Sequence, residues 1–255
     1  MNVTDPISDP PRSATRRAMA PDQIEVERKY GAGDGVEAIA RRVADLGGSE
    51  IGSVTFTDTY YDTPECALTA NDVWLRRRDD RWEIKVPIPG DARRSGGERS
   101  VFREVEGAAG CLAELREVLA AAPISAEHRK GKSENDEARD DRQGEDADDD
   151  EGLRRFAYSR SVAPFASFAT TRAKFSLDGA AIDVDSASFG HTVVEVEVLC
   201  GAAGEVPAAE ALVRAVAEKL ALEDVGATGG KLETYLRRNC PKHLETLVAK
   251  GVLRP

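Results

Sequence analysis

Six stretches of the sequence alternate charged and apolar residues with a period of two, and this alternation limits the folds open to the chain. In the stretch 24–30, Glu25, Glu27 and Lys29 fall on one face of an extended strand, and Val26 falls on the other. The pattern recurs in 73–78, 82–86, 172–175, 182–185 and 192–198. A single strand of this kind is typical of an antiparallel sheet with one face in water. Six such strands indicate a shared face that carries charges of both signs, opposite an apolar face that must be covered.

Turn residues and periodicity divide the chain into eight predicted strands and four predicted helices. The strands are predicted over 23–30, 54–61, 72–78, 82–87, 99–106, 165–177, 181–186 and 191–199. The helices are predicted over 35–46, 110–121, 207–222 and 231–250. We therefore predict an α+β fold in which eight antiparallel strands close into a β-barrel around a charged tunnel, with helices packed outside.

Two segments differ in composition from the rest of the chain. Residues 1–22 are rich in Pro, Ser and Arg and are predicted to form a flexible tail. Between 127 and 151, twelve acidic and five basic residues occur with only two apolar ones, too few for a folded core. The sequence thus predicts a single tunnel domain over 23–250, interrupted by a disordered acidic insertion over 125–152.

The overall charge and hydropathy exclude several classes of partner. A formal net charge of −11 argues against a nucleic-acid-binding protein, which needs a basic surface. No run of about 18 apolar residues occurs, so we expect no membrane-spanning helix. The expected oligomeric state is a monomer by default.

The cysteines and histidines are scattered along the chain. Cys66, Cys111, Cys200 and Cys240 form no Cys-x-x-Cys motif and have no histidine at zinc spacing, which predicts reduced thiols and a cytoplasmic protein. The basic stretch 12–18 resembles part of a transit peptide, so mitochondrial targeting is the alternative. His128, His191 and His243 suggest no nucleophilic triad, and structural or exposed roles are expected for them.

The charged face defines a type of chemistry. Carboxylates spaced two apart on neighbouring strands supply the hard oxygen ligands that Mg²⁺ and Mn²⁺ prefer. Lysine and arginine on the same face suit a polyanion, because guanidinium groups bind phosphate oxygens in pairs. Such a site can neutralise and position a phosphate chain, which is most of what phosphoryl transfer requires.

The residues of this face resemble the CYTH superfamily, the triphosphate tunnel metalloenzymes. The Glu-x-Glu-x-Lys motif at 25–29 matches the first strand of that family, and further matches follow in the family's order at 58–64, 74–78, 82–85, 172–174, 183–185, 195–197 and 231–235. The resemblance spans about 23–238. Within the family, the segments IEVERKY, VTFTDTYYDTP and WLRRRDD are most similar to the thiamine triphosphatase branch.

This resemblance implies roles for individual residues. The positions that match the family's triphosphate-binding residues are Lys29, Arg76, Arg78, Lys85, Arg172 and Lys231, with Lys174 as a further candidate. The positions that match its Mg²⁺-binding residues are Glu25, Glu27, Glu104, Asp183, Glu195 and Glu197, with Mn²⁺ as the alternative metal. Lys85, Tyr60 and Glu27 are the expected catalytic residues.

The implied activity is metal-dependent hydrolysis of thiamine triphosphate to thiamine diphosphate and phosphate. Trp74 bears on the substrate, because its indole can stack on the cationic thiazolium and the pyrimidine of thiamine. If Trp74 is structural instead, inorganic triphosphate becomes the expected substrate. A cyclase acting on a nucleoside triphosphate and a polyphosphate-binding module without turnover remain as alternatives, and a small triphosphate is the sole partner expected.

Overall fold

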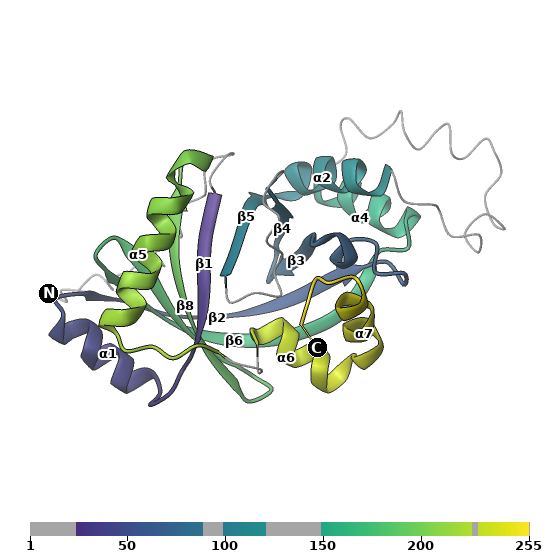
Figure 1. Ribbon diagram of the computed structural model, residues 1–255. Coiled ribbons are helices and arrows are strands. Elements are labelled where there is room, and N and C mark those ends of the chain that lie inside the picture. Colours follow the sequence, from purple (N-terminus) through teal and green to yellow (C-terminus); the bar gives the residue numbers. More distant parts are fainter. Residues whose placement is uncertain (1–23, 89–98, 121–148, 226–228, 255) are drawn as a thin grey trace, which may run out of the picture.

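The computed structural model describes residues 24–88, 99–120, 149–225 and 229–254, and within them eight antiparallel strands form a closed barrel (Figure 1). Around the barrel the strands follow the order β1-β5-β4-β3-β2-β6-β7-β8, and β8 pairs with β1. The strands are β1 (Ile24–Gly31), β2 (Ser49–Asp62), β3 (Trp74–Arg78), β4 (Arg81–Pro87), β5 (Arg99–Glu106), β6 (Ala163–Leu177), β7 (Ala180–Ala187) and β8 (His191–Cys200). The predicted fold class is therefore confirmed.

The strand register places the charged faces inside the barrel. Arg76 is paired with Glu83 across β3 and β4, and Lys85 is paired with Glu104 across β4 and β5. The outward face carries the apolar residues, such as Ile84, which is fully buried. The alternation thus predicted the orientation of these side chains correctly.

The hydrophobic core lies between the barrel wall and the helices. On one side of the barrel, Val184 and Val196 belong to a cluster that is covered by α1 (Val36–Asp45) and α5 (Val206–Lys219). On the other side, Leu75, Ile84 and Leu115 belong to a cluster that is covered by α2 (Ala108–Ala120) and α4 (Asp149–Ser159). Figure 1 shows α5 along β1 and β8, and α2 beside α4. Each large buried side chain stabilises the fold by about 1.5–3 kcal/mol, so this packing can support a charged interior.

The second strand begins earlier than predicted. It starts at Ser49 rather than at 54 and pairs with β6 along its length, with a bulge between Glu50 and Gly52. Ile51 and Val54 are exposed in this extension. The sequence therefore shows no alternation of buried and exposed residue types that would predict a strand there. The turn before it needs small residues: Gly47 has φ +80°, and a Cβ on Gly48 would lie 2.6 Å from the Ser176 carbonyl oxygen.

Two helical predictions require correction. The predicted helix 231–250 is two helices, α6 (Lys231–Asn239) and α7 (Pro241–Ala249), because Pro241 has no N–H to continue the first. The predicted disorder up to 152 is wrong at its end, since α4 begins at Asp149. Asp150 accepts a hydrogen bond from Trp82 Nε1 at 2.5 Å, and Leu153 is fully buried. These tertiary contacts stabilise the first turn of α4 although its residues are acidic.

The described residues also include two short 3₁₀ helices, η1 (Thr69–Asn71) and η3 (Ala203–Glu205). The predicted tail 1–22 and positions 125–148 of the predicted insertion lie outside the described residues. Within the described ranges, no helix is both long and apolar enough to cross a membrane.

Candidate active site

The barrel interior holds a first group of basic residues on β3, which bind carboxylates of β2, β4 and β5. Arg76 donates to Glu83 Oε2 at 2.7 Å and to Glu104 Oε1 at 3.1 Å. Arg78 binds both oxygens of Asp58, at 2.8 and 3.0 Å. Burial works against the charge of Arg76, but Glu83 and Asp58 outweigh it and raise the pKa of Arg76 above its ordinary value. The hydrogen bonds to these carboxylates hold both guanidinium groups in position.

A second basic group lies on β6 and at the start of α6. Arg172 Nη1 lies 2.5 Å from Asp183, and Arg172 Nη2 lies 2.6 Å from Asp185 and 2.7 Å from Glu195. Lys231 reaches into the same network, binding Asp185 and, at 3.1 Å, Glu195. Burial together with the charges of Arg172 and Arg78 lowers the pKa of Lys231 well below its ordinary value. The helix α6 thus inserts a lysine among the groups of the barrel.

An aromatic ring lies between the two basic groups. The guanidinium carbon of Arg78 lies 4.0 Å from the ring centroid of Phe56, and that of Arg172 lies 5.4 Å from it. Cation–π contacts of this kind orient guanidinium groups in a desolvated site. Lys174 completes the basic set and lies 3.2 Å from Asp183.

Three carboxylates on β1 and β8 form the strongest candidate for a metal site in the barrel. One oxygen each of Glu25, Glu27 and Glu197 lie within 4.8 Å of one another. Lys85 binds Glu25 and lies 3.6 Å from Glu27, and Lys29 binds Glu27. Three carboxylates supply the hard oxygen donors that a Mg²⁺-sized ion prefers, so these residues fit such an ion.

Two of these carboxylates, Glu25 and Glu197, differ in their affinity for protons. Burial raises the pKa of Glu197 to about 8, assisted by the negative charges of Glu25 and Asp183. Burial also disfavours the charge of Glu25, but Lys85 and Arg76 outweigh it and lower its pKa to about 2. The two side chains share a hydrogen bond. Near neutral pH the pair therefore holds one proton, which a cation would have to displace.

The remaining predicted metal ligands lie elsewhere in the interior. Glu104 contacts Arg76 through one oxygen, and its Oε2 is buried without a hydrogen-bond partner. Asp183 and Glu195 bind Arg172. The structure thus brings three of the six predicted ligands together and places the other three against guanidinium groups.

The two predicted aromatic residues occupy different surroundings. Tyr60 is buried opposite Arg76 in the register, at 6.0 Å from Phe168 between ring centroids, and burial raises its pKa. Trp74 is half-buried, and its Nε1 donates to Asp72 Oδ1 at 2.8 Å. It packs against the cluster formed by Leu236 and its neighbours on α6 and α7. Trp74 therefore has a packing role, and its contact with substrate stays a prediction.

Three interior carboxylates had no assigned role in the sequence-based site. Asp58, Glu83 and Asp185 are all buried and each binds an interior arginine. The alternation places each of them on the charged face, next to a residue that was assigned. This position two residues from a site residue was the signal available in the sequence.

Comparison with known proteins agrees with this architecture. A model of the CYTH domain family matches residues 23–228, and the chain belongs to this family. It is 34% identical over 236 residues to thiamine-triphosphatase from Macaca fascicularis and 34% identical over 240 residues to thiamine-triphosphatase from Homo sapiens; each match covers 90% of this chain and 91% of the relative. A solved structure from Vibrio parahaemolyticus is similar in fold, with a TM-score of 0.50 at 14% identity over 85% of this chain and 99% of the other.

Proposed function

We propose that the protein is a Mg²⁺-dependent hydrolase that converts thiamine triphosphate and water to thiamine diphosphate and phosphate. The arrangement of the barrel interior supports this function. Two basic groups lie around Phe56, and their arginines act electrostatically on the carboxylate cluster of Glu25, Glu27 and Glu197. A phosphate chain and a divalent cation need these two environments side by side. The relatives at 34% identity are thiamine-triphosphatases, which supports this substrate.

The basic residues would bind and orient the phosphate chain. Arg76, Arg78 and Arg172 each present a guanidinium that a carboxylate already holds in one orientation. A phosphate group can bind to the donor edges that remain, or can replace a carboxylate. Because the side chains are ordered beforehand, binding costs little of their conformational entropy.

Glu25, Glu27 and Glu197 are the residues that would hold Mg²⁺, which when bound supplies neutralisation of charge on the phosphate chain. Hydrolysis itself forms a bond from a water oxygen to the γ-phosphorus and breaks the bond to the β,γ-bridging oxygen. Lys85 lies beside this cluster through its contacts with Glu25 and Glu27, a position from which it can stabilise negative charge on the phosphate. Tyr60, next to Arg76, is the further residue proposed to contact the substrate.

A second candidate is hydrolysis of inorganic triphosphate on the same residues. The packing of Trp74 against α6 and α7, with Nε1 bound to Asp72, favours it, because a structural tryptophan leaves the organic part of the substrate without a stacking partner.

The deciding experiment is phosphate release from thiamine triphosphate, tripolyphosphate and ATP at equal concentrations with Mg²⁺, for wild type and Trp74→Ala. Preference for thiamine triphosphate that is lost in Trp74→Ala supports the proposal. Preference for tripolyphosphate, with little effect of the substitution, supports the second candidate. No release from any substrate, despite triphosphate binding, would overturn both and indicate a binding module; cyclic nucleotide formed from ATP would indicate a cyclase.

The metal assignment has its own test. Glu27→Gln should weaken Mg²⁺ binding at least tenfold, because it removes one of three carboxylate ligands. Glu50→Gln, on the exposed start of β2, is the matched control and should bind as wild type does. Equal Mg²⁺ requirements in all three proteins would contradict the assignment.

A further inference from the structure

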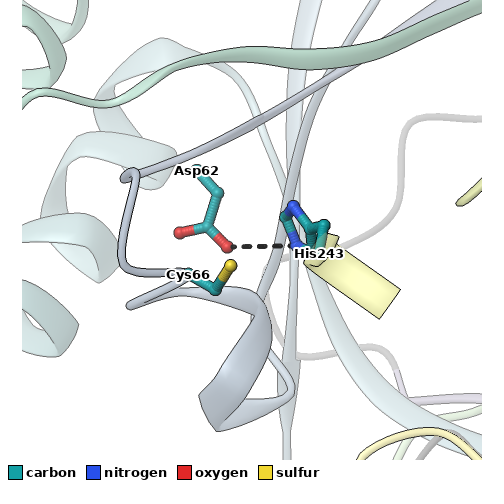
Figure 2. A group of neighbouring side chains, drawn as sticks. All are labelled: Asp62, Cys66 and His243. Atoms are coloured by element: carbon teal, nitrogen blue, oxygen red, sulfur yellow. Dashed lines mark ion pairs between the residues drawn. The ribbon is translucent and has the colours of Figure 1, made fainter. Parts of the chain in front are cut away.

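A second group of potential metal ligands lies outside the barrel interior, where the end of β2 meets α7. It consists of Asp62, the last residue of β2, Cys66 in the following loop, and His243 on α7. One ligand atom of each lies within 4.8 Å of the others. Figure 2 shows the carboxylate and the thiol both directed toward the imidazole. Cys66 and His243 are 177 positions apart in the sequence, so no short spacing motif identifies the group.

Asp62 is a buried carboxylate without a lysine or arginine partner among the described residues. Its exposed fraction is 3%, and the one basic group within ion-pair distance is His243, whose Nε2 lies 3.9 Å away. Burial lowers the pKa of His243, which favours the neutral imidazole. The barrel carboxylate Asp58, by contrast, is bound to an arginine. The surroundings of Asp62 are therefore suited to a further positive charge.

Hydrogen bonds already hold the carboxylate in place. Asp62 accepts from the backbone N–H groups of Thr63, Leu68 and Thr69 at 2.7–2.9 Å. It also accepts from the Thr69 hydroxyl at 2.5 Å, and that hydroxyl lies 2.8 Å from His243 Nε2. The hydroxyl thus bridges the carboxylate and the imidazole. Its rotation would release one oxygen of Asp62 and Nε2 of His243 toward a shared ligand, while the backbone N–H groups still hold the carboxylate.

We propose that Asp62, Cys66 and His243 bind a borderline divalent transition metal of the zinc class, at a site separate from the carboxylate cluster in the barrel. A thiolate and an imidazole favour Zn²⁺ or Co²⁺ over Mg²⁺, which prefers oxygen ligands throughout. Three protein ligands leave the fourth tetrahedral position to water or to the Thr69 hydroxyl.

A nucleophilic role explains the cluster less well. Burial raises the pKa of the Cys66 thiol to about 11, assisted by the charge of Asp62, so at neutral pH the group is not a nucleophilic thiolate. Metal binding would displace the thiol proton. The bound metal would connect the loop after β2 to α7, next to the helix α6 that carries Lys231 into the barrel.

Cobalt is the probe for this site. Protein freed of metal with a chelator is titrated with Co²⁺, and a thiolate-to-cobalt charge-transfer band at one equivalent is expected. Cys66→Ser should lose the band. Cys240→Ser, a cysteine outside the cluster, and Glu27→Gln, in the barrel, should both keep it. Absence of the band in folded wild type, or its persistence in Cys66→Ser, would overturn the proposal.

Thermal unfolding gives an independent readout. One equivalent of Zn²⁺ should raise the Tm of wild type and of Cys240→Ser, because a ligand that binds only the folded state stabilises it. The Tm of Cys66→Ala and of His243→Asn should rise much less than that of wild type, because, of the two ligand clusters, only the carboxylate cluster in the barrel is left to bind the ion. Circular dichroism confirms that both variants are folded. An unchanged Tm in wild type would mean that the cluster is a hydrogen-bonded contact alone.

Discussion

The raised pKa of Glu197 predicts that Mg²⁺ affinity depends steeply on pH. Burial and the charges of Glu25 and Asp183 place this pKa at about 8, so the carboxyl is protonated at pH 7. A metal binds the ionised form, and the proton therefore competes with it below pH 8. The affinity for Mg²⁺ therefore rises with pH and levels off once Glu197 is ionised. With a pKa of about 8, the affinity for Mg²⁺ should increase about tenfold between pH 7 and pH 9.

Calorimetric titration with Mg²⁺ at several pH values tests this prediction. Measured in buffers of different ionisation enthalpy, binding should release roughly one proton per ion at pH 7 and close to none at pH 9. Glu197→Gln removes the titrating group, so its weaker binding should be nearly independent of pH over this range. Glu50→Gln, exposed on β2, should retain the wild-type dependence. A flat profile in wild type, or an unchanged slope in Glu197→Gln, would show that Glu197 is not the group that competes with the metal for a proton.

Three further predictions concern the network, the tryptophan and the core. Arg172→Ala leaves its buried carboxylate partners without this cation, so urea unfolding should show that the free energy of unfolding falls by about 3–5 kcal/mol. Arg155→Ala removes an exposed ion pair and should lower the free energy of unfolding by under about 1 kcal/mol. Asp72→Gly suits the backbone at φ 62° but removes the acceptor for Trp74 Nε1. The KM for thiamine triphosphate should therefore rise about 2- to 10-fold in steady-state kinetics. Asp72→Asn retains an acceptor oxygen and should change this KM less. Leu115→Ala should lower the free energy of unfolding by about 2–5 kcal/mol in denaturant titration and leave KM unchanged, because this side chain lies outside the barrel wall.

Much of the barrel was predictable because its strands carry a strong local pattern. Residues such as Glu27 and Arg172 alternate with apolar neighbours, and a period of two assigns each to a face before any pairing is known. When helices cover the apolar faces and the strands close into a barrel, the charged faces point inward. The same reasoning placed the interior lysines and arginines of the strands, whereas Lys231 on α6 was assigned by the family resemblance alone.

Other features depend on contacts that the local sequence does not encode. The acidic run before Leu153 resembles a solvated segment, yet α4 begins at Asp149, because Leu153 packs against other helices and Asp150 accepts from Trp82. Alternation also could not separate the interior carboxylates that form the proposed metal site from those that bind arginines. It assigns a face, whereas the register decides that Glu27 lies opposite Glu197 while Asp183 lies opposite Lys174.

Alternation, turn residues and motifs are enough to predict the strands apart from the start of β2, the side on which each strand carries its charges, and the family that the CYTH match confirms. Which charges meet depends on the fold of the whole chain. Barrel closure brings Glu25 on β1 near Glu197 on β8 and raises the pKa of Glu197, and docking of α7 brings His243 to Asp62 and Cys66. The physical reason is that strand periodicity is a local property of the backbone, whereas distances between strands and helices arise from packing of the whole chain.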